Sequence, residues 1–181
     1  MIEPVIYSDP RGFFFESYHQ GKFEELGITG HFVQDNHSKS MRGTLRGLHY
    51  QLKFPQAKLC RVIQGEVLDV AVDIRRNSPC FGQWMSTLLS AENKHQVYIP
   101  AGFAHGFLVL SETAEFLYKC DEFYRPQDER GIAWNDPQIG IEWGIERIGM
   151  ENLILSGKDT RNPLLRDMPP EDLPLYPGSG S

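Results

Sequence analysis

Three side chains have types suited to moving a proton on and off a carbon atom beside a ketone. His49 is an imidazole, whose pKa lies near neutral pH, so it could act as a general base. Lys58 supplies a fixed positive charge that could stabilise the oxyanion of the resulting enolate, and His105 offers a second imidazole. Spacing alone leaves ordinary roles open, because a single histidine is often a hydrogen-bonded core residue and a lysine is often a solvated surface charge.

The charges around these residues favour a small, negatively charged ligand. Residues 36–65 contain no Asp or Glu and carry a charge of +6 from Lys and Arg, whereas the whole chain has a net charge of −6, which leaves −12 for the remainder. Such a cationic segment could bind a diphosphate, since arginine can contact two phosphate oxygens at once. A chance clustering of charges is the alternative. The negative overall balance argues against nucleic acid or an anionic membrane as a partner.

A metal-dependent reaction is the main chemical alternative. Residues 100–105 contain the pattern Pro-x-Gly-x-x-His, which resembles the second metal-binding motif of the cupin superfamily. The first cupin motif would need a histidine and a glutamate where this sequence has Gln51 and Lys58. Because an ammonium group repels a divalent cation, and two histidines are too few for a closed site, we predict no bound metal and no cofactor.

Short strands must position these residues, because the hydrophobic pattern indicates little helix. From residue 66 to residue 74 apolar side chains alternate with Asp69 and Asp73, which predicts a half-buried strand with the two acids on the other face. A turn at Gly65 is expected to join residues 58–63 and 66–74 as a hairpin. Further strand-like runs cover residues 12–17, 31–36, 83–89, 96–99, 106–110, 115–121 and 131–134, and one short helix is expected at residues 21–26.

This pattern predicts an all-β fold, such as a sandwich, a barrel or a double-sheet jelly roll with a few short helices. The length of 181 residues suits a single domain, assigned to residues 1–176, followed by a flexible tail at residues 177–181. No apolar run is long enough to span a membrane, and the start of the chain lacks the basic residues of a secretory signal. Three cysteines without disulfide or metal spacing are expected to be reduced, so we predict a cytoplasmic protein.

Several segments, in order along the chain, carry a more specific resemblance. They are Arg11-Gly12-Phe13-Phe14-Phe15-Glu16, Gln34-Asp35-Asn36, and residues 45–51, 65–73, 100–107, 116–119 and 156–159. Together they resemble the dTDP-4-dehydrorhamnose 3,5-epimerase family. The resemblance implies a jelly-roll homodimer of the cupin type, without metal or cofactor. It also implies conversion of dTDP-4-dehydro-6-deoxy-D-glucose to dTDP-4-dehydro-L-rhamnose in rhamnose biosynthesis.

The resemblance also implies a role for each site residue. His49 would remove the protons at C5 and C3, Asp159 would pair with it, Lys58 would stabilise the C4 enolate, and Tyr118 would return a proton on the opposite face. The substrate-binding set would be Arg11, Glu16, Gln34, Asn36, Arg46, His105, Tyr124, Glu129 and Lys158, with Tyr124 stacking on thymine. Two departures from the family pattern are Ala57 in place of a glycine and Cys60 in place of a valine.

Three other functions remain open at this point. The nearest is a single-site epimerase, acting at C3 or C5 of a related nucleotide 4-keto sugar in an antibiotic-sugar pathway, because both enzymes would use the same base and acid. A metal-dependent cupin oxygenase is disfavoured by Gln51 and Lys58. A noncatalytic sugar-nucleotide binding module would need the same pocket but no base.

Overall fold

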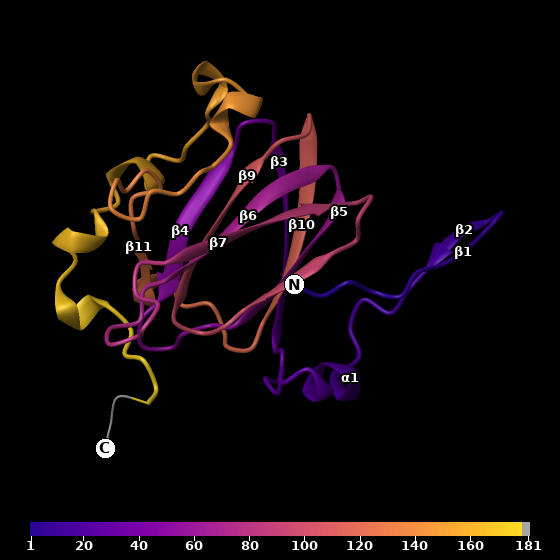
Figure 1. The fold of residues 1–181 in the computed structure, drawn as a ribbon, viewed down its shortest axis with the longest axis horizontal. Helices are drawn as coiled ribbons and strands as arrows, with labels where there is room; N and C mark the ends of the chain where they lie inside the picture. The colour runs from indigo at the N-terminus through magenta and orange to yellow at the C-terminus, as the bar shows by residue number, and fades with distance from the viewer. Residues whose placement is uncertain (179–181) are drawn as a thin grey trace.

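Two antiparallel β-sheets form the body of the protein (Figure 1), and the computed structural model describes residues 1–178. One sheet has four strands, in the order β3 (Gln34–Met41), β10 (Thr113–Cys120), β5 (Lys58–Gln64) and β8 (Gln96–Ile99). The other has five strands, in the order β11 (Glu129–Gly131), β4 (Leu45–Gln51), β9 (Phe103–Val109), β6 (Glu66–Asp73) and β7 (Trp84–Ser90). The predicted all-β jelly roll is confirmed.

Helical segments are short and lie outside the two sheets. The predicted helix at residues 21–26 corresponds to α1 (Gln20–Glu25), which begins after the His19 N-cap and buries Phe23. The 3-10 turns are η1 (Pro126–Asp128), η2 (Ile145–Arg147), η3 (Met150–Asn152), η4 (Asp159–Arg161), η5 (Leu165–Asp167) and η6 (Pro170–Asp172). Within residues 1–178, each helix is too short or too polar to cross a membrane. Part of the predicted tail, residues 179–181, lies outside the described residues.

The space between the two sheets is filled by apolar side chains from both. Phe107 on β9 stacks on Phe116 on β10, with ring centroids 4.3 Å apart. Around this pair pack buried side chains of both sheets, namely Cys60, Val62, Val67, Ala71, Leu89, Val97, Ile99, Val109 and Ala114. Phe107 and Phe116 also line a cavity in the protein, so this core borders the space where a site could lie.

The outer face of the five-stranded sheet is also buried. The C-terminal part of the chain, orange to yellow in Figure 1, lies over this face. It packs Trp143, Leu165 and Leu173 against strand residues in a second apolar cluster. The prediction of a half-buried strand at residues 66–74 was therefore wrong, because β6 is buried on both faces. Its acids, Asp69 and Asp73, are only 2% and 1% exposed and find partners inside the protein.

The predicted hairpin between residues 58–63 and 66–74 was also wrong. β5 pairs with β10 and β8, whereas β6 pairs with β7 and β9, so the chain changes sheets at Gly65. Gly65 has a φ of +77°, and a Cβ atom there would lie 2.0 Å from the carbonyl oxygen of Thr113. The glycine was correctly recognised as a turn residue, but the turn crosses from one sheet to the other.

An N-terminal hairpin projects from this body (Figure 1). It consists of β1 (Tyr7–Asp9) and β2 (Gly12–Phe14), which pair only with each other. Its apolar side chains Tyr7, Phe13 and Phe14 are more than 60% exposed. A two-stranded hairpin alone is only marginally stable in water, and these side chains form an exposed apolar surface on it.

Candidate active site

A cavity of about 740 Å³ opens between the two sheets. It gathers most of the side chains that the sequence singled out, although they are distributed over more than a hundred positions of the chain. Those lining it are Gln34, Asn36, Arg46, His49, Lys58, His105, Tyr118, Tyr124, Glu129 and Asp159. The cavity is therefore the candidate active site, and its walls combine imidazole, carboxylate, ammonium, guanidinium and phenol groups.

Strand β4 carries His49 to the cavity wall. His49 lies opposite His105 on β9 and Gly131 on β11, so it is held by backbone pairing on both sides. Gly106 allows β9 to approach β4 closely, because a Cβ atom there would lie 2.7 Å from the carbonyl oxygen of Arg46. Rigid pairing of this kind fixes the direction of the imidazole before any ligand binds.

The imidazole of His49 is hydrogen-bonded to the buried carboxylate of Asp159. Its Nε2 atom lies 2.5 Å from Asp159 Oδ1, and the Ser156 hydroxyl donates to Asp159 Oδ2 at 2.8 Å. Burial opposes ionisation of Asp159, but the hydrogen bonds from His49 and Ser156 outweigh it and lower the pKa of this carboxyl. An ionised Asp159 holds a proton on His49 Nε2, which leaves Nδ1 as the nitrogen that can accept a proton.

A second carboxylate, Glu129, lies on the other side of the same imidazole. Glu129 Oε1 is 3.8 Å from His49 Nδ1. The same carboxylate forms an ion pair with Lys158 and accepts a hydrogen bond from the Tyr124 hydroxyl at 2.8 Å. Burial raises the pKa of Glu129, but these two donors outweigh it, so the pKa is lowered and the group stays ionised. Lys158 and Tyr124 thus meet at Glu129, at the rim of the cavity.

Lys58 and Tyr118 face His49 from the four-stranded sheet. They lie on the neighbouring strands β5 and β10, with Lys58 Nζ 5.8 Å from the centre of the Tyr118 ring. Within the described chain, Lys58 Nζ has no carboxylate partner and the Tyr118 hydroxyl has no hydrogen-bond partner, so both remain available to a ligand. Burial raises the pKa of Tyr118 to about 12, which keeps its proton in place at neutral pH.

His105 is buried at the back of the cavity and has its own carboxylate. Its Nε2 atom lies 2.8 Å from Asp69 Oδ2, and both side chains are less than a tenth exposed. Sequence reasoning did not select Asp69, because strand alternation assigned it to the opposite face of a half-buried strand. The sequence feature that could have identified Asp69 is its place as an acid within an otherwise apolar strand. A carboxylate that is buried in such a strand requires a partner.

Polar side chains from β3 and β4 line the open side of the cavity. Gln34 donates to Asn36 Oδ1 at 3.0 Å and accepts from the Tyr124 backbone N–H at 2.9 Å, so it connects β3 to the segment after β10. Arg46 is exposed and donates through Nε to Ser40 Oγ at 3.1 Å, which leaves the rest of its guanidinium free to bind an anion. These groups could bind the polar part of a ligand.

Two of the predicted ligand-binding residues lie away from this cavity in the described chain. Arg11 is on the projecting hairpin, where it forms an ion pair with Asp9 at 2.6 Å. Glu16 follows the hairpin and pairs with Lys22. Gln51 occupies the position of a cupin metal ligand but does not line the cavity. Its side-chain amide instead donates to the carbonyl oxygens of Phe54 and Phe123.

An all-β jelly roll with an imidazole–carboxylate pair facing a lysine and a tyrosine across an open cavity defines the class of cupin-like sugar epimerases. Comparison with known proteins identifies the family within this class. The sequence profile described as dTDP-4-dehydrorhamnose 3,5-epimerase matches residues 1–167, and the chain belongs to that family. The predicted resemblance is confirmed, and so is the prediction of an enzyme of the isomerase class.

Individual relatives agree with this assignment. The chain is 56% identical over 168 residues to a dTDP-4-dehydrorhamnose 3,5-epimerase of Pseudomonas aeruginosa, an alignment that covers 92% of this chain and 91% of the relative. It is 50% identical to an enzyme of the same name from Methanothermobacter thermautotrophicus, covering 93% and 90%. The crystal structure of a Legionella pneumophila dTDP-6-deoxy-D-glucose-3,5-epimerase in complex with dTDP-4-keto-L-rhamnose has a TM-score of 0.93 and 53% identity, covering 97% of this chain and 92% of that one.

Proposed function

We propose that this protein converts dTDP-4-dehydro-6-deoxy-D-glucose to dTDP-4-dehydro-L-rhamnose by inverting C3 and C5 of the sugar. The observation that supports this most directly is one cavity that holds a carboxylate-paired imidazole and, across from it, an unpaired ammonium and a protonated phenol. Relatives at 50% to 56% identity bear the name of this activity, which favours double over single inversion.

The reaction needs a base, a group that stabilises the enolate, and an acid on the far face. His49 Nδ1 would take the proton from C5 or C3, while ionised Asp159 stabilises the imidazolium that forms. The electron pair moves onto the C4 oxygen, where Lys58 would stabilise the negative charge. Tyr118 would then donate its proton to the carbon from the side of the opposite sheet, so the stereocentre is inverted. The tyrosinate is reprotonated by solvent, and His49 releases its proton.

The rest of the substrate would be bound by the remaining side chains of the cavity. Arg46 belongs to the acid-free segment and is suited to the diphosphate. Tyr124 is exposed at the rim, where its ring could stack on thymine while its hydroxyl stays bonded to Glu129. His105, Gln34 and Asn36 would bind the polar groups of the sugar and phosphate.

We further propose that two copies form a homodimer in the cytoplasm. The exposed apolar side chains of the β1–β2 hairpin support a second copy as the partner, and Arg11 at the hairpin turn, followed by Glu16, would then reach the cavity of that copy. This arrangement accounts for two binding residues that do not line their own cavity. The three free cysteines suit a reducing compartment.

The proposed function is tested by incubating the purified protein with dTDP-4-dehydro-6-deoxy-D-glucose and following the sugar by proton NMR. We expect a product with inverted C3 and C5, and turnover that falls by about 10² or more in His49→Asn. Inversion at one carbon would identify a single-site epimerase. Recovery of unchanged sugar, despite saturable binding, would instead indicate a binding module, and consumption of dioxygen would indicate an oxygenase.

A further inference from the structure

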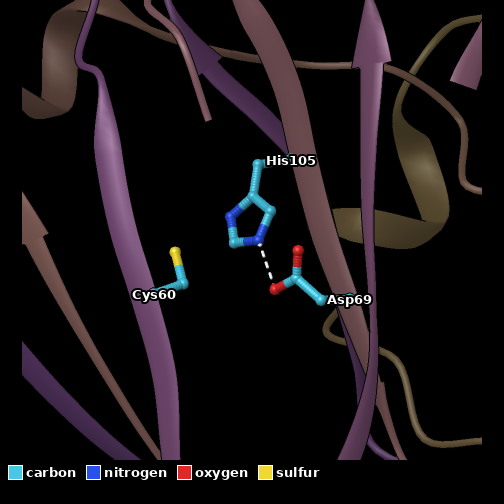
Figure 2. A group of neighbouring side chains, drawn as sticks. All are labelled: Cys60, Asp69 and His105. Carbon is cyan, nitrogen blue, oxygen red and sulfur yellow. Dashed lines mark hydrogen bonds and ion pairs between the residues drawn. The ribbon is translucent and has the colours of Figure 1, made fainter. Parts of the chain in front are cut away.

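Behind the wall of the cavity, three potential metal ligands lie close together. Cys60 on β5, Asp69 on β6 and His105 on β9 each place one ligand atom so that the three atoms lie within 4.8 Å of one another. Figure 2 shows the His105 imidazole between the Cys60 sulfur and the Asp69 carboxylate, with the hydrogen bond to Asp69 marked. The ligands come from both sheets, so this group joins the two halves of the sandwich.

The types and burial of these ligands match a particular class of metal ion. Thiolate, imidazole and carboxylate are the groups that Zn²⁺ binds in proteins, whereas Mg²⁺ and Ca²⁺ prefer oxygen ligands alone. All three side chains are less than a tenth exposed, so their donor atoms compete little with water. Two donor atoms on one tetrahedral zinc ion are separated by roughly 3.3–3.6 Å. The three atoms lie within 4.8 Å of one another, so movements of about 1 to 1.5 Å would bring the most widely separated pair to this spacing.

We propose that Cys60, Asp69 and His105 form a binding site for a single zinc-like divalent ion, and that occupation of this site inhibits the enzyme. In forming the sulfur–metal bond the Cys60 thiol loses its proton to solvent, while the neutral imidazole offers the lone pair of one nitrogen. Three protein ligands leave a fourth position for water.

Inhibition follows from the place of His105. The same imidazole lines the cavity and is oriented by its hydrogen bond to Asp69. A metal ion that takes both groups as ligands replaces that hydrogen bond and turns the ring toward Cys60. This inhibitory half of the inference rests on the proposed function, whereas metal binding itself does not.

Burial also selects among ions that could enter. It raises the pKa of the Cys60 thiol well above its ordinary value, so an ion must bind sulfur strongly to displace the proton. Thiophilic ions such as Zn²⁺, Cd²⁺ and Co²⁺ satisfy this condition, whereas Mg²⁺ does not.

The site is tested with the full chain after removal of metals by a chelator, using Co²⁺ alone as a spectroscopic probe. We expect one Co²⁺ per chain and a thiolate-to-cobalt charge-transfer band in the near ultraviolet. Cys60→Val should remove the band and weaken Zn²⁺ binding, measured by competition with a chromophoric chelator, by at least about tenfold. Cys80→Ala is the matched control, because Cys80 is an exposed free thiol, and it should bind as the unmodified chain does.

Two results would overturn the proposal. A wild-type chain that shows no charge-transfer band at saturating Co²⁺ has no thiolate ligand, and a Cys60→Val variant that keeps the affinity for Zn²⁺ has its site elsewhere. Circular dichroism of each variant checks that it is folded.

The inhibitory half of the proposal is tested by adding Zn²⁺ to the enzyme assay. Zn²⁺ should slow turnover of the wild type and of Cys80→Ala but not of Cys60→Val, and equal slowing of all three would contradict inhibition through this site. A chain without turnover would refute the proposed function, while the absorption band would still report the metal site.

Discussion

At the scale of single residues, the two carboxylates beside His49 act differently. Asp159 is buried and bonded to Nε2 at 2.5 Å, so it controls which nitrogen carries the proton. Glu129 lies 3.8 Å from Nδ1, and its charge is shared with Lys158 and Tyr124. Asp159 is therefore the carboxylate in direct contact with the imidazole, while Glu129 joins Lys158 and Tyr124 at the rim of the cavity.

Replacing Asp159 by Asn should remove this control while keeping the size of the side chain. We expect kcat to fall by about 10² to 10⁴ with a small change in KM, because the wrong tautomer of His49 would face the sugar. Steady-state kinetics measure both constants. Asp167→Asn is the control, since Asp167 is an exposed acid that does not line the cavity, and it should behave as the wild type. Equal kinetics for the two variants would contradict the role assigned to Asp159.

The same carboxyl should make stability depend on pH in a defined direction. Its pKa in the folded state is below the ordinary value of 3.8, so ionised Asp159 stabilises the fold above that pH. This contribution is lost as the pH falls below 3.8 and through the folded pKa. We expect the difference in free energy of unfolding between wild type and Asp159→Asn to shrink as the pH falls below 3.8. Urea denaturation across this range measures it, and a difference that grows toward low pH would be the opposite result.

At the scale of elements, the change of sheets at Gly65 holds β5 and β6 in opposite walls of the sandwich. Gly65→Ala should destabilise the protein by about 2 kcal/mol or more, because the φ of +77° is unfavourable for alanine and its Cβ would meet the Thr113 carbonyl. The midpoint of urea denaturation reports this loss. Gly157→Ala is a matched control, since a Cβ atom at Gly157 has no neighbour within 4 Å. A Gly65→Ala variant as stable as the control would mean that the crossing is not constrained.

The strands predicted from the sequence correspond to observed ones where alternation is regular, as in β10 and β8. Strand β4, which carries Arg46 and His49, was not predicted, because its glycine and its mixed polarity give no alternating pattern. What fixes β4 is pairing with β9 and β11, which come more than fifty positions later. Likewise, β6 was predicted to be half-buried because nothing local shows that residues after 131 cover its outer face.

At the scale of the whole molecule, the fold class and the grouping of the cavity residues could be predicted, the latter through family resemblance rather than physics. The pairing of Asp69 with His105 could not be predicted, because the burial of Asp69 depends on the tertiary arrangement. The group of Cys60, Asp69 and His105 was missed for the same reason: cysteine spacing along the chain says nothing about ligands from three separate strands.

We propose that residues 1–176 fold as one domain, since the Tyr176 N–H donates to the Arg76 carbonyl and ties the C-terminal end to the body.

The projecting hairpin leads to a prediction about assembly. Phe14→Asp should convert a dimer into a monomer, because a charge would replace an exposed apolar side chain in the proposed contact. Light scattering coupled to size exclusion measures the mass in solution. Met85→Asp serves as the control, since Met85 is exposed on β7, an edge strand of the five-stranded sheet that does not pair with the hairpin. A monomeric wild type, or two variants that both remain dimers, would contradict a dimer formed through the hairpin.

The central claim is that His49 removes protons from carbon and that Tyr118 returns them from the other side. The most direct measurement is deuterium incorporation from D₂O into the dTDP-4-keto sugar, resolved by carbon position with NMR. We expect label at both C3 and C5 with the wild type and none with His49→Asn. Tyr118→Phe should still exchange a proton but should yield little inverted product. Label at neither carbon with the wild type, or full exchange without His49, would contradict this mechanism.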